Sequence, residues 1–280
     1  MDKTILAVFA HPDDEAFGTG GTLARYADEG NQVVLVCATR GEVGEISDES
    51  LATPETLGLV REEELRCAAA KIGVSELIFL DYRDSGMVGT PENEDPKAFI
   101  NAPAEEVVPQ IVRIIREVRP QVVITFEPHG GYGHPDHIAI HKHTVAAFHL
   151  SADKQYHADL RPVWQPERLF YTAIPGSFFL EVRDKMRALG MDTADLDRFE
   201  EAGEQWPDEQ IHAVIDVAEW VDAKWEALYC HRTQFSPNNL FRRLPEETMK
   251  QMMGKEHFAL AWPEPAKGLA LSGLLDGLRG

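Results

Sequence analysis

Short apolar runs alternate with amphipathic stretches through the first half of the chain. Uninterrupted apolar runs that stop at turn signals predict strands buried on both faces. Such runs lie at 4–10, 32–38, 76–80 and 121–126. Apolar residues at helical spacing lie between and after them, at 16–29, 60–72, 107–118 and 138–150. Strand and helix therefore alternate four times, which predicts an α/β fold with a Rossmann-like open, mostly parallel sheet and helices on both faces.

The pattern loosens in the second half of the chain. One more strand is predicted at 169–174, and helices are predicted at 178–189 and 218–229. The tail from residue 263 onward is apolar and rich in Leu and Gly, and it could make contacts in a homo-oligomer.

We expect one domain over residues 1–280, because the sequence contains neither an internal repeat nor a low-complexity linker. Residues 1–150 would form the parallel α/β core. Residues 151–280 would add a C-terminal helical extension that completes the binding pocket. In open parallel sheets a ligand lies beyond the carboxyl ends of the strands, so residues that directly follow the predicted strands are the candidates for chemistry.

The chain is strongly acidic, with 47 Asp and Glu against 27 Lys and Arg and a net charge of −20. This charge argues against nucleic acid, which is bound through cationic contacts to phosphate, and against an anionic membrane surface. The first apolar run, at 5–10, is too short for the core of a signal peptide or for a bilayer span. We therefore expect a cytoplasmic protein that binds neither nucleic acid nor membrane.

The three cysteines lie far apart in the sequence, without a CxxC pair. An odd count at such spacing suits a reducing compartment and argues against a disulfide scaffold. Cys37 lies in an apolar strand and Cys67 on a helix beside alanines, so both are predicted to be small core residues. Cys230 precedes His231, and no nucleophilic role is assigned to it.

One histidine and three acidic residues directly follow the first predicted strand, as His11-Pro12-Asp13-Asp14-Glu15. If a helix begins near Pro12, His11 and Asp14 are three residues apart and can converge on one ion. Imidazole and carboxylate ligands suit zinc. The alternative is helix capping, since acidic residues in a first turn interact well with the helix dipole without any metal. That alternative is strongest for Glu15, which could instead support the metal site from behind, and weakest for His11.

Six of the eleven histidines lie between His129 and His149, just after the fourth predicted strand. The motif Gly130-Gly131-Tyr132-Gly133-His134-Pro135-Asp136-His137 opens the helix that follows. His134 and His137 are three residues apart, so that one can bind a metal while the other faces the substrate. A competing pairing joins His137 to His141, four residues along. For His141, His143 and His149, a structural role on an exposed helix is favoured.

The motifs AHPDDE and GGYGHPDH together resemble the zinc-dependent PIG-L/LmbE family of N-acetylglucosamine deacetylases. YRDSGM at 82–87, FINA at 99–102 and KWEALYCHRTQ at 224–234 extend the similarity toward the mycothiol-type branch, which acts on an N-acetylglucosaminyl-inositol. The resemblance covers roughly residues 4 to 235. It implies a Rossmann-like fold, a single Zn²⁺ ion with Fe²⁺ as the alternative metal, and a small amino-sugar substrate.

Carried over by position, the resemblance implies that His11, Asp14 and His137 bind the metal and that Asp13 is the general base. It further implies that His134 stabilises the transition state, with Asp136 orienting its imidazole. Tyr132 would contact the amide oxygen. The resemblance carries over less directly to the substrate contacts, which would be Arg40, Glu42, Asp84 and His231. For Arg40 a loop salt bridge, and for Asp84 an Asx-turn, are equally good alternatives.

The activity implied is hydrolysis of the N-acetyl amide of a glucosamine-containing glycoside, which releases acetate and a free amine. Asp13 would accept a proton from the attacking water and later deliver it to the amine. We expect His134 to be protonated, because Asp136 and the acidic surroundings favour the imidazolium. The alternatives are an amidase that cleaves S-conjugates of a glucosaminyl thiol and a non-catalytic sugar-binding relative.

Overall fold

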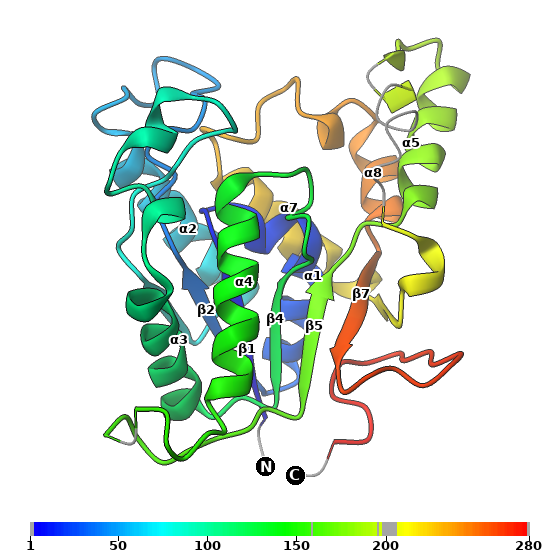
Figure 1. Ribbon diagram of the computed structural model, residues 1–280. Coiled ribbons are helices and arrows are strands. Elements are labelled where there is room, and N and C mark those ends of the chain that lie inside the picture. The colour runs from blue at the N-terminus through cyan, green and yellow to red at the C-terminus, as the bar shows by residue number, and fades with distance from the viewer. Residues whose placement is uncertain (1–2, 158, 195, 198–205, 279–280) are drawn as a thin grey trace.

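A seven-stranded sheet runs through the middle of the protein in the order β3-β2-β1-β4-β5-β7-β6 (Figure 1). The computed structural model describes residues 3–157, 159–194, 196–197 and 206–278. The first five strands pair in parallel, while β7 pairs antiparallel with both β5 and β6. The strands are β1 (Thr4–Phe9), β2 (Gln32–Cys37), β3 (Glu76–Phe79), β4 (Val122–Phe126), β5 (Arg168–Thr172), β6 (Ala213–Asp216) and β7 (Lys255–Trp262).

Helices cover both faces of the sheet, as the alternating pattern predicts (Figure 1). One face is covered by α1 (Asp14–Asp28), α2 (Leu57–Ile72) and α7 (Val221–Cys230), and the other by α3 (Ala104–Val118) and α4 (Pro135–Leu150). Two further helices, α5 (Gly176–Ala188) and α8 (Glu246–Met252), pack with the first group. Short 3-10 turns lie at Pro91–Glu94, Phe99–Asn101, Asp208–Gln210, Ala218–Trp220 and Leu240–Arg242.

The two faces of β1 show why the parallel strands are apolar throughout. Ile5 and Phe9 lie in the core beneath α1, α2 and α7, whereas Leu6 and Val8 lie in the core beneath α3 and α4. A strand that is covered on both sides has no solvent-exposed face for polar residues. The uninterrupted apolar runs therefore located these strands to within about two residues of where the structure has them.

The C-terminal part differs from the helical extension that the sequence predicts. It contributes β6 and β7 to the same sheet. β7 pairs with β5, the last of the parallel strands, and β6 pairs with β7. β6 has only four residues, which alternate between buried and exposed. The tail returns to its own chain, where Arg168 Nη1 donates to the Leu274 carbonyl at 2.8 Å and the Leu274 N–H donates to the Tyr26 hydroxyl oxygen at 2.6 Å.

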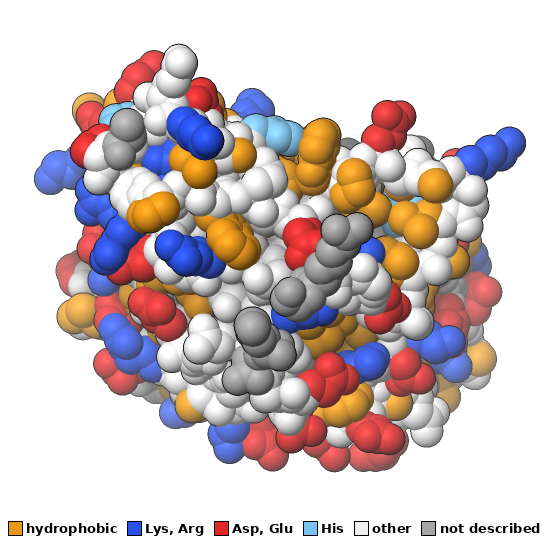
Figure 2. All heavy atoms as spheres, turned by 90° about the horizontal axis from the view of Figure 1, so that it is seen from below, with side chains coloured by type: hydrophobic (Ala, Val, Ile, Leu, Met, Phe, Trp, Pro, Cys, Tyr) orange, Lys and Arg blue, Asp and Glu red, His pale blue; other side chains and the backbone are white. Residues whose placement is uncertain are grey.

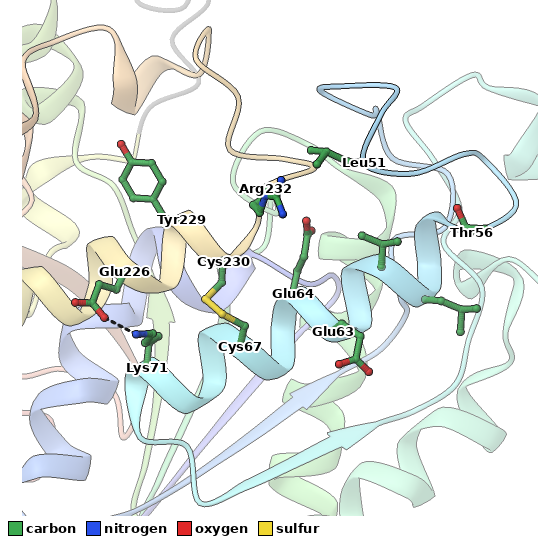
Figure 3. A pocket seen from close by; sticks show the side chains of 12 residues that line it. Leu51, Thr56, Glu63, Glu64, Cys67, Lys71, Glu226, Tyr229, Cys230 and Arg232 are labelled. Carbon is green, nitrogen blue, oxygen red and sulfur yellow. Dashed lines mark hydrogen bonds and ion pairs between the residues drawn. A yellow bond between two sulfur atoms is a disulfide. The ribbon is translucent and has the colours of Figure 1, made fainter.

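The cysteines correct a second expectation. Cys37 is buried as predicted, but a disulfide joins Cys67 to Cys230 and so links α2 to α7 (Figure 3). The prediction that Cys67 is a core residue is wrong, because it lies on an exposed part of α2. The two positions are 163 residues apart, and only the packing of the two helices brings them together.

The sheet has two distinct ends. The carboxyl ends of the parallel strands lie at the top of Figure 1, and the amino ends lie at the bottom. There Lys3 Nζ donates to the Leu278 carbonyl at 3.0 Å, which joins the two ends of the described chain. Seen from this side, acidic and basic side chains are interspersed, with small hydrophobic groups between them (Figure 2). Within the described ranges, no helix has the length and apolar character needed to cross a membrane.

Candidate active site

A cavity of about 870 Å³ lies at the carboxyl ends of β1, β4 and β5. Asp13, Asp14 and His137 lie on its wall, together with Tyr132 from the loop that follows β4. The rest of the wall is largely aromatic and apolar, and is formed by Phe17, Phe126, Ile174, Phe179, Trp206, Leu240 and Phe241. Several of these residues come from beyond residue 151, so the C-terminal part of the chain supplies one side of the cavity.

Three side chains from two strand ends converge at one point of this cavity. His11 follows β1, Asp14 begins α1, and His137 lies in the first turn of α4. The His11 Nδ1 and His137 Nε2 atoms are 3.1 Å apart, and Asp14 Oδ1 is 3.2 Å from His137 Nε2. The other Asp14 oxygen accepts the backbone N–H groups of Ala10 and His11 at 3.1 and 2.8 Å. Although burial opposes ionisation of Asp14, the His137 and His11 imidazoles hold its pKa well below the ordinary value.

The hydrogen bonds of the His11 and His137 imidazoles direct His11 Nδ1 and His137 Nε2 toward the same point. His137 Nδ1 donates to the Gly130 carbonyl at 3.0 Å, and His11 Nε2 donates to Asp136 Oδ2 at 3.1 Å. These tautomers follow from the partners, and they leave two lone pairs facing each other. A divalent cation at that point would be bound by both lone pairs. Burial lowers the pKa of His11, but the nearby carboxylates, Asp84 foremost, raise it well above its ordinary value.

This donor set fits a divalent metal. Two imidazole lone pairs and a carboxylate oxygen are the ligands that catalytic zinc sites commonly use. His134 is also close, since one nitrogen from each of His11, His134 and His137 lies within 4.8 Å of the others. His141, the competing candidate, instead donates through Nδ1 to the Phe126 carbonyl at 2.8 Å.

Asp13 has a backbone conformation that is uncommon outside glycine, with φ at +114°, although Asp tolerates it better than most residues. The Pro12–Asp13 peptide group is held on both sides. Arg61 Nη2 donates to the Pro12 carbonyl at 2.6 Å, and the Asp13 N–H donates to Glu15 Oε2 at 3.0 Å. Burial raises the pKa of Asp13 from 3.8 to about 6, against the opposing effect of Arg61. This carboxylate can therefore exchange a proton near neutral pH.

His134 caps the amino end of α4, where its Nδ1 accepts the backbone N–H of Asp136 at 3.2 Å. Burial, with the neighbouring His11 and His137, lowers the pKa of His134 to about 3. The expectation of a protonated His134 is therefore wrong, because the Asp136 carboxylate faces His11 instead. With Nδ1 acting as an acceptor, the neutral ring carries its proton on Nε2, which remains able to donate a hydrogen bond.

Two buried carboxylates lie behind His11. Asp136 Oδ2, besides its contact with His11, accepts the Ser85 N–H at 2.9 Å. Asp84 Oδ1 lies 3.5 Å from the same His11 nitrogen and accepts the Gly86 N–H at 2.9 Å, which is the Asx-turn contact left open by the sequence. Both carboxylates orient His11, as the outer partners of ligating histidines commonly do. Neither Asp84 nor Asp136 lines the cavity.

Tyr132 is 59% exposed, and its ring centroid is 5.2 Å from that of His137. Its loop is ordered by Glu127, whose two carboxylate oxygens accept the N–H groups of His129 and Gly131. Three glycines give the loop positive φ angles of +74°, +73° and +84°, at Gly130, Gly131 and Gly133. The loop thus places the tyrosine at the edge of the cavity above the converging imidazoles.

The other predicted substrate contacts lie away from the cavity. Arg40 forms ion pairs with Glu62 and, at 2.7 Å, with Asp81, which is the loop salt bridge that the sequence left open. Glu42 accepts the N–H groups of Arg40 and Asp84 at 3.3 and 3.0 Å. Both residues therefore stabilise the loops around the site from outside the cavity.

His231 is also remote from the cavity wall. Its imidazole is fully buried, and Nε2 lies 2.7 Å from Glu15 Oε1. Glu15 in turn contacts the backbone of Asp13. His231 therefore does not reach the cavity. It contacts Glu15, which holds the backbone of Asp13.

Sequence reasoning missed Arg61 and Glu127. A cation near the amino end of a helix opposes the helix dipole, so Arg61 among the first residues of α2 was an unusual placement that could have marked it. Its guanidinium is 4% exposed and also donates to the Gly41 carbonyl at 3.0 Å. Glu127 directly follows β4, where its strand-end position was the available signal.

Comparison with known proteins shows what the chain resembles. Residues 6–148 match the model of the PIG-L family, described as GlcNAc-PI de-N-acetylase. A protein from Thermomonospora curvata, named 1D-myo-inositol 2-acetamido-2-deoxy-alpha-D-glucopyranoside deacetylase, is 40% identical over 100% of this chain and 98% of its own length. A protein of the same name from Geodermatophilus obscurus is 39% identical over 92% of each chain.

Solved structures share the fold at lower identity. The N,N'-diacetylchitobiose deacetylase from Pyrococcus horikoshii is 21% identical, with a TM-score of 0.65 over 92% of this chain and 83% of that one. GalB, a 4-carboxy-2-hydroxymuconate hydratase, is 18% identical with a TM-score of 0.63 over 96% of this chain and 100% of that one. The same fold thus carries different reactions, and the family is assigned from the family model and the full-length relatives: the chain belongs to the PIG-L family of de-N-acetylases.

Proposed function

We propose that this enzyme hydrolyses the N-acetyl amide of a glucosamine-containing glycoside, with an inositol glycoside as the preferred substrate. The observation that carries the proposal is the position of Asp13, a half-buried carboxylate with a pKa of about 6 on the cavity wall, beside the converging His11, Asp14 and His137. The family and the names of the full-length relatives support the choice of an N-acetyl amino sugar.

We propose zinc as the metal, held by His11 Nδ1, His137 Nε2 and Asp14 Oδ1, with Fe²⁺ as the alternative. When bound, zinc would act as a Lewis acid that brings the pKa of a water molecule down to about 7. Asp136 and Asp84 keep the other nitrogen of His11 occupied, which leaves Nδ1 available for the ion.

Asp13 acts as general base and then as general acid. Its carboxylate takes a proton from the attacking water and passes it to the amine as the amide bond breaks. A single group can serve both steps because its pKa is close to neutral, and Arg61 keeps it from rising further. The clamp on the Pro12–Asp13 peptide holds the carboxylate in place during both transfers.

His134 and Tyr132 stabilise the negative charge that builds on the amide oxygen. His134 donates through Nε2–H as a neutral imidazole, because its pKa of about 3 keeps it uncharged at neutral pH. Donors fixed in advance toward a developing oxyanion commonly contribute about 10²–10³-fold in rate. The exposed Tyr132 is the second donor, held at the edge of the cavity by its glycine-rich loop.

The C-terminal part of the chain binds the rest of the substrate. Trp206, Leu240 and Phe241 form an apolar part of the cavity wall, which suits the apolar face of a pyranose ring. We propose that residues 1–150 carry the chemistry and residues 151–280 complete the pocket within a single domain.

The test is acetate and amine release by purified, zinc-loaded protein from a panel of N-acyl glucosaminides. The panel contains N-acetylglucosaminyl-inositol, diacetylchitobiose, free N-acetylglucosamine and an S-conjugate in which a cysteinyl amide replaces the acetamide. We expect the inositol glycoside to be hydrolysed best. Cleavage of the S-conjugate alone would establish the amidase instead, and no release from any member would reject the proposal. The His137→Ala protein, which lacks one proposed ligand, is the inactive control.

A further inference from the structure

A buried pair, Glu15 and His231, lies directly behind the proposed general base. The two side chains are 1% and 0% exposed, and His231 Nε2 donates to Glu15 Oε1 at 2.7 Å. The other Glu15 oxygen accepts the N–H of Asp13 at 3.0 Å. A chain of two hydrogen bonds therefore connects the end of α7 to the backbone of Asp13.

This chain supplies one half of the clamp on the Pro12–Asp13 peptide group. Arg61 holds the carbonyl of that group, and Glu15 holds its N–H. The orientation of the peptide group sets the positive φ of Asp13, a conformation that persists only where surrounding contacts enforce it. The direction of the Asp13 carboxylate thus depends on Glu15 remaining in place.

Helix capping does not account for this arrangement. An acidic residue in the first turn of α1 would interact with the helix dipole while exposed to water. Glu15 is instead buried, and its partner comes from 216 positions along the chain. A buried carboxylate without a partner is costly, so His231 is the residue that allows Glu15 to reach Asp13 from the interior.

We propose that Glu15 and His231 are positioning residues for Asp13: His231 fixes the Glu15 carboxylate, which fixes the backbone that aims the base. Neither residue contacts the substrate or the metal. The inference rests on the proposed function, since Asp13 is the base of that reaction, but it also makes a structural prediction that can be checked without any substrate.

The test compares His231→Leu with His231→Gln in the full-length, zinc-loaded enzyme. Leucine cannot donate to Glu15, whereas the glutamine amide can. We expect kcat of H231L to fall about 10²-fold, the effect of displacing a catalytic group by about 1 Å. KM and zinc content should stay close to wild type, because His231 is remote from the cavity, and H231Q should recover most of the lost kcat. Ser151→Ala is the matched control: it removes a 2.8 Å buried hydrogen bond to the Phe148 carbonyl at the far end of α4 and should keep kcat.

An unchanged kcat in H231L, or an equal loss in S151A, would overturn the proposal. If H231L does not fold, Glu15→Gln replaces it, because one amide oxygen cannot serve both Asp13 and His231; an unchanged kcat there has the same meaning. Crystal structures separate this inference from the proposed function. Asp13 should leave its positive-φ conformation in H231L, and its retention would contradict the inference whether or not the wild type releases acetate.

A second inference comes from the disulfide, an independent observation. Cys67 and Cys230 line an open groove of about 940 Å³ between α2 and α7 (Figure 3). Cys67 is exposed, whereas Cys230 is 8% exposed and directly precedes His231. On α2, Cys67 lies one turn after Glu64, whose carboxylate binds the Thr233 N–H and hydroxyl at 2.8 and 2.6 Å. The disulfide thus links the helix that carries Arg61 and Glu64 to the segment that carries His231 and Thr233.

We propose that this disulfide is a reducible brace of the Asp13 support. The thiolate of a dithiol reductant attacks the exposed Cys67 sulfur, forms a mixed disulfide there and releases the Cys230 thiolate, which takes a proton from water. The second thiol of the reductant then attacks the mixed disulfide. Both cysteines end as thiols, and the reductant ends as a cyclic disulfide. Freed of the crosslink, the two segments move apart more easily and Asp13 loses part of its support.

Dithiothreitol is the probe for this step. Thiol titration of the unfolded protein should give one thiol before reduction and three after it, and the loss of kcat on reduction should reverse on reoxidation and dialysis against zinc. Cys67→Ser is the matched control, which should have the kcat of the reduced enzyme and should not respond to dithiothreitol. Equal activity of the reduced and oxidised enzyme would overturn the proposal. So would an equal response of C67S, since this would identify the loss as removal of the metal.

Discussion

Replacement of Asp13 by asparagine tests the proposed chemistry most directly. Asparagine has the same shape and also tolerates positive φ, and its amide oxygen can still accept from Arg61, which lies 3.3 Å from Asp13 Oδ2. It cannot take up a proton. The variant therefore removes the proton transfer while it leaves the cavity and the metal ligands intact.

The magnitude follows from the two steps assigned to this group. A positioned acid or base contributes about 10²–10⁴-fold, and Asp13 serves both the water and the leaving amine. We expect kcat to fall about 10³–10⁴-fold, equivalent to about 4–5 kcal/mol in the activation free energy. In the wild type, activity needs ionised Asp13, so it should fall as the pH drops through about 6. The charge of a bound cation lowers the pKa of Asp13, so it moves this acidic fall in activity to lower pH and never to higher pH.

The same variant makes an opposite prediction for stability. Because burial raises the pKa of Asp13 from 3.8 to about 6, its contribution to the free energy of unfolding decreases as the pH rises from about 4 to about 6. Above pH 6 the charge on Asp13 costs up to roughly 3 kcal/mol, a net figure that already includes the opposing effect of Arg61. Metal-free D13N should therefore be at least as stable as the metal-free wild type at pH 7.5, with no such advantage at pH 4.

Three measurements decide the matter: acetate release under steady-state conditions, zinc content, and urea unfolding of the metal-free proteins at pH 7.5 and pH 4. A D13N protein with full zinc content and a kcat within tenfold of wild type would refute the role of Asp13 as base. A loss of more than about 1 kcal/mol on substitution at pH 7.5, beyond the usual effect of a surface change, would refute the reasoning about its buried charge.

Three further outcomes are expected. Lys224→Met should lower the free energy of unfolding in urea by about 3–5 kcal/mol, because it leaves Glu256 buried without its 2.7 Å partner; a loss below about 1 kcal/mol would contradict this. Burial lowers the pKa of His141, so the unfolded chain takes up the proton more readily and the contribution of His141 to stability should fall as the pH drops below about 6.5. His141→Asn should lose less stability between pH 7 and pH 5, and parallel curves would disprove this account. Removal of the metal with EDTA should lower Tm by several degrees and zinc should restore it, since a hundredfold excess over Kd adds about 2.7 kcal/mol; an unchanged Tm on adding zinc would argue against the site at His11.

The first half of the chain was predictable because each parallel strand is covered on both faces. Full burial leaves an uninterrupted apolar run, and the helices between the strands keep one apolar side. The short edge strand β6 gave no such signal, and the apolar run at 258–262 in its antiparallel neighbour β7 was not recognised as a strand. β6 alternates between buried and exposed positions, and β7 begins with Lys255 and Glu256, whose burial pattern depends on the helices packed against them. The pairing of β7 with β5, and of β6 with β7, is decided by tertiary packing.

The site divides in the same way. His11, Asp13, Asp14, His134 and His137 were identifiable because they follow strands that end at one edge of the sheet, where local chemistry and position coincide. The charge of His134 could not be identified from the sequence, because it depends on which imidazole the Asp136 carboxylate faces. That carboxylate binds His11, and no spacing rule distinguishes the two imidazoles.

By itself the sequence determined the order of strands and helices, the family motifs and the residues at the strand ends, because these depend on neighbours within a few positions. Only the tertiary structure decided which distant side chains meet. The Cys67–Cys230 disulfide, the Glu15–His231 pair and the clamp of Arg61 on Pro12 each join segments far apart in the chain. The physical reason is that hydrogen bonds and crosslinks depend on distances of a few ångströms, which helix packing sets and hydrophobic periodicity does not.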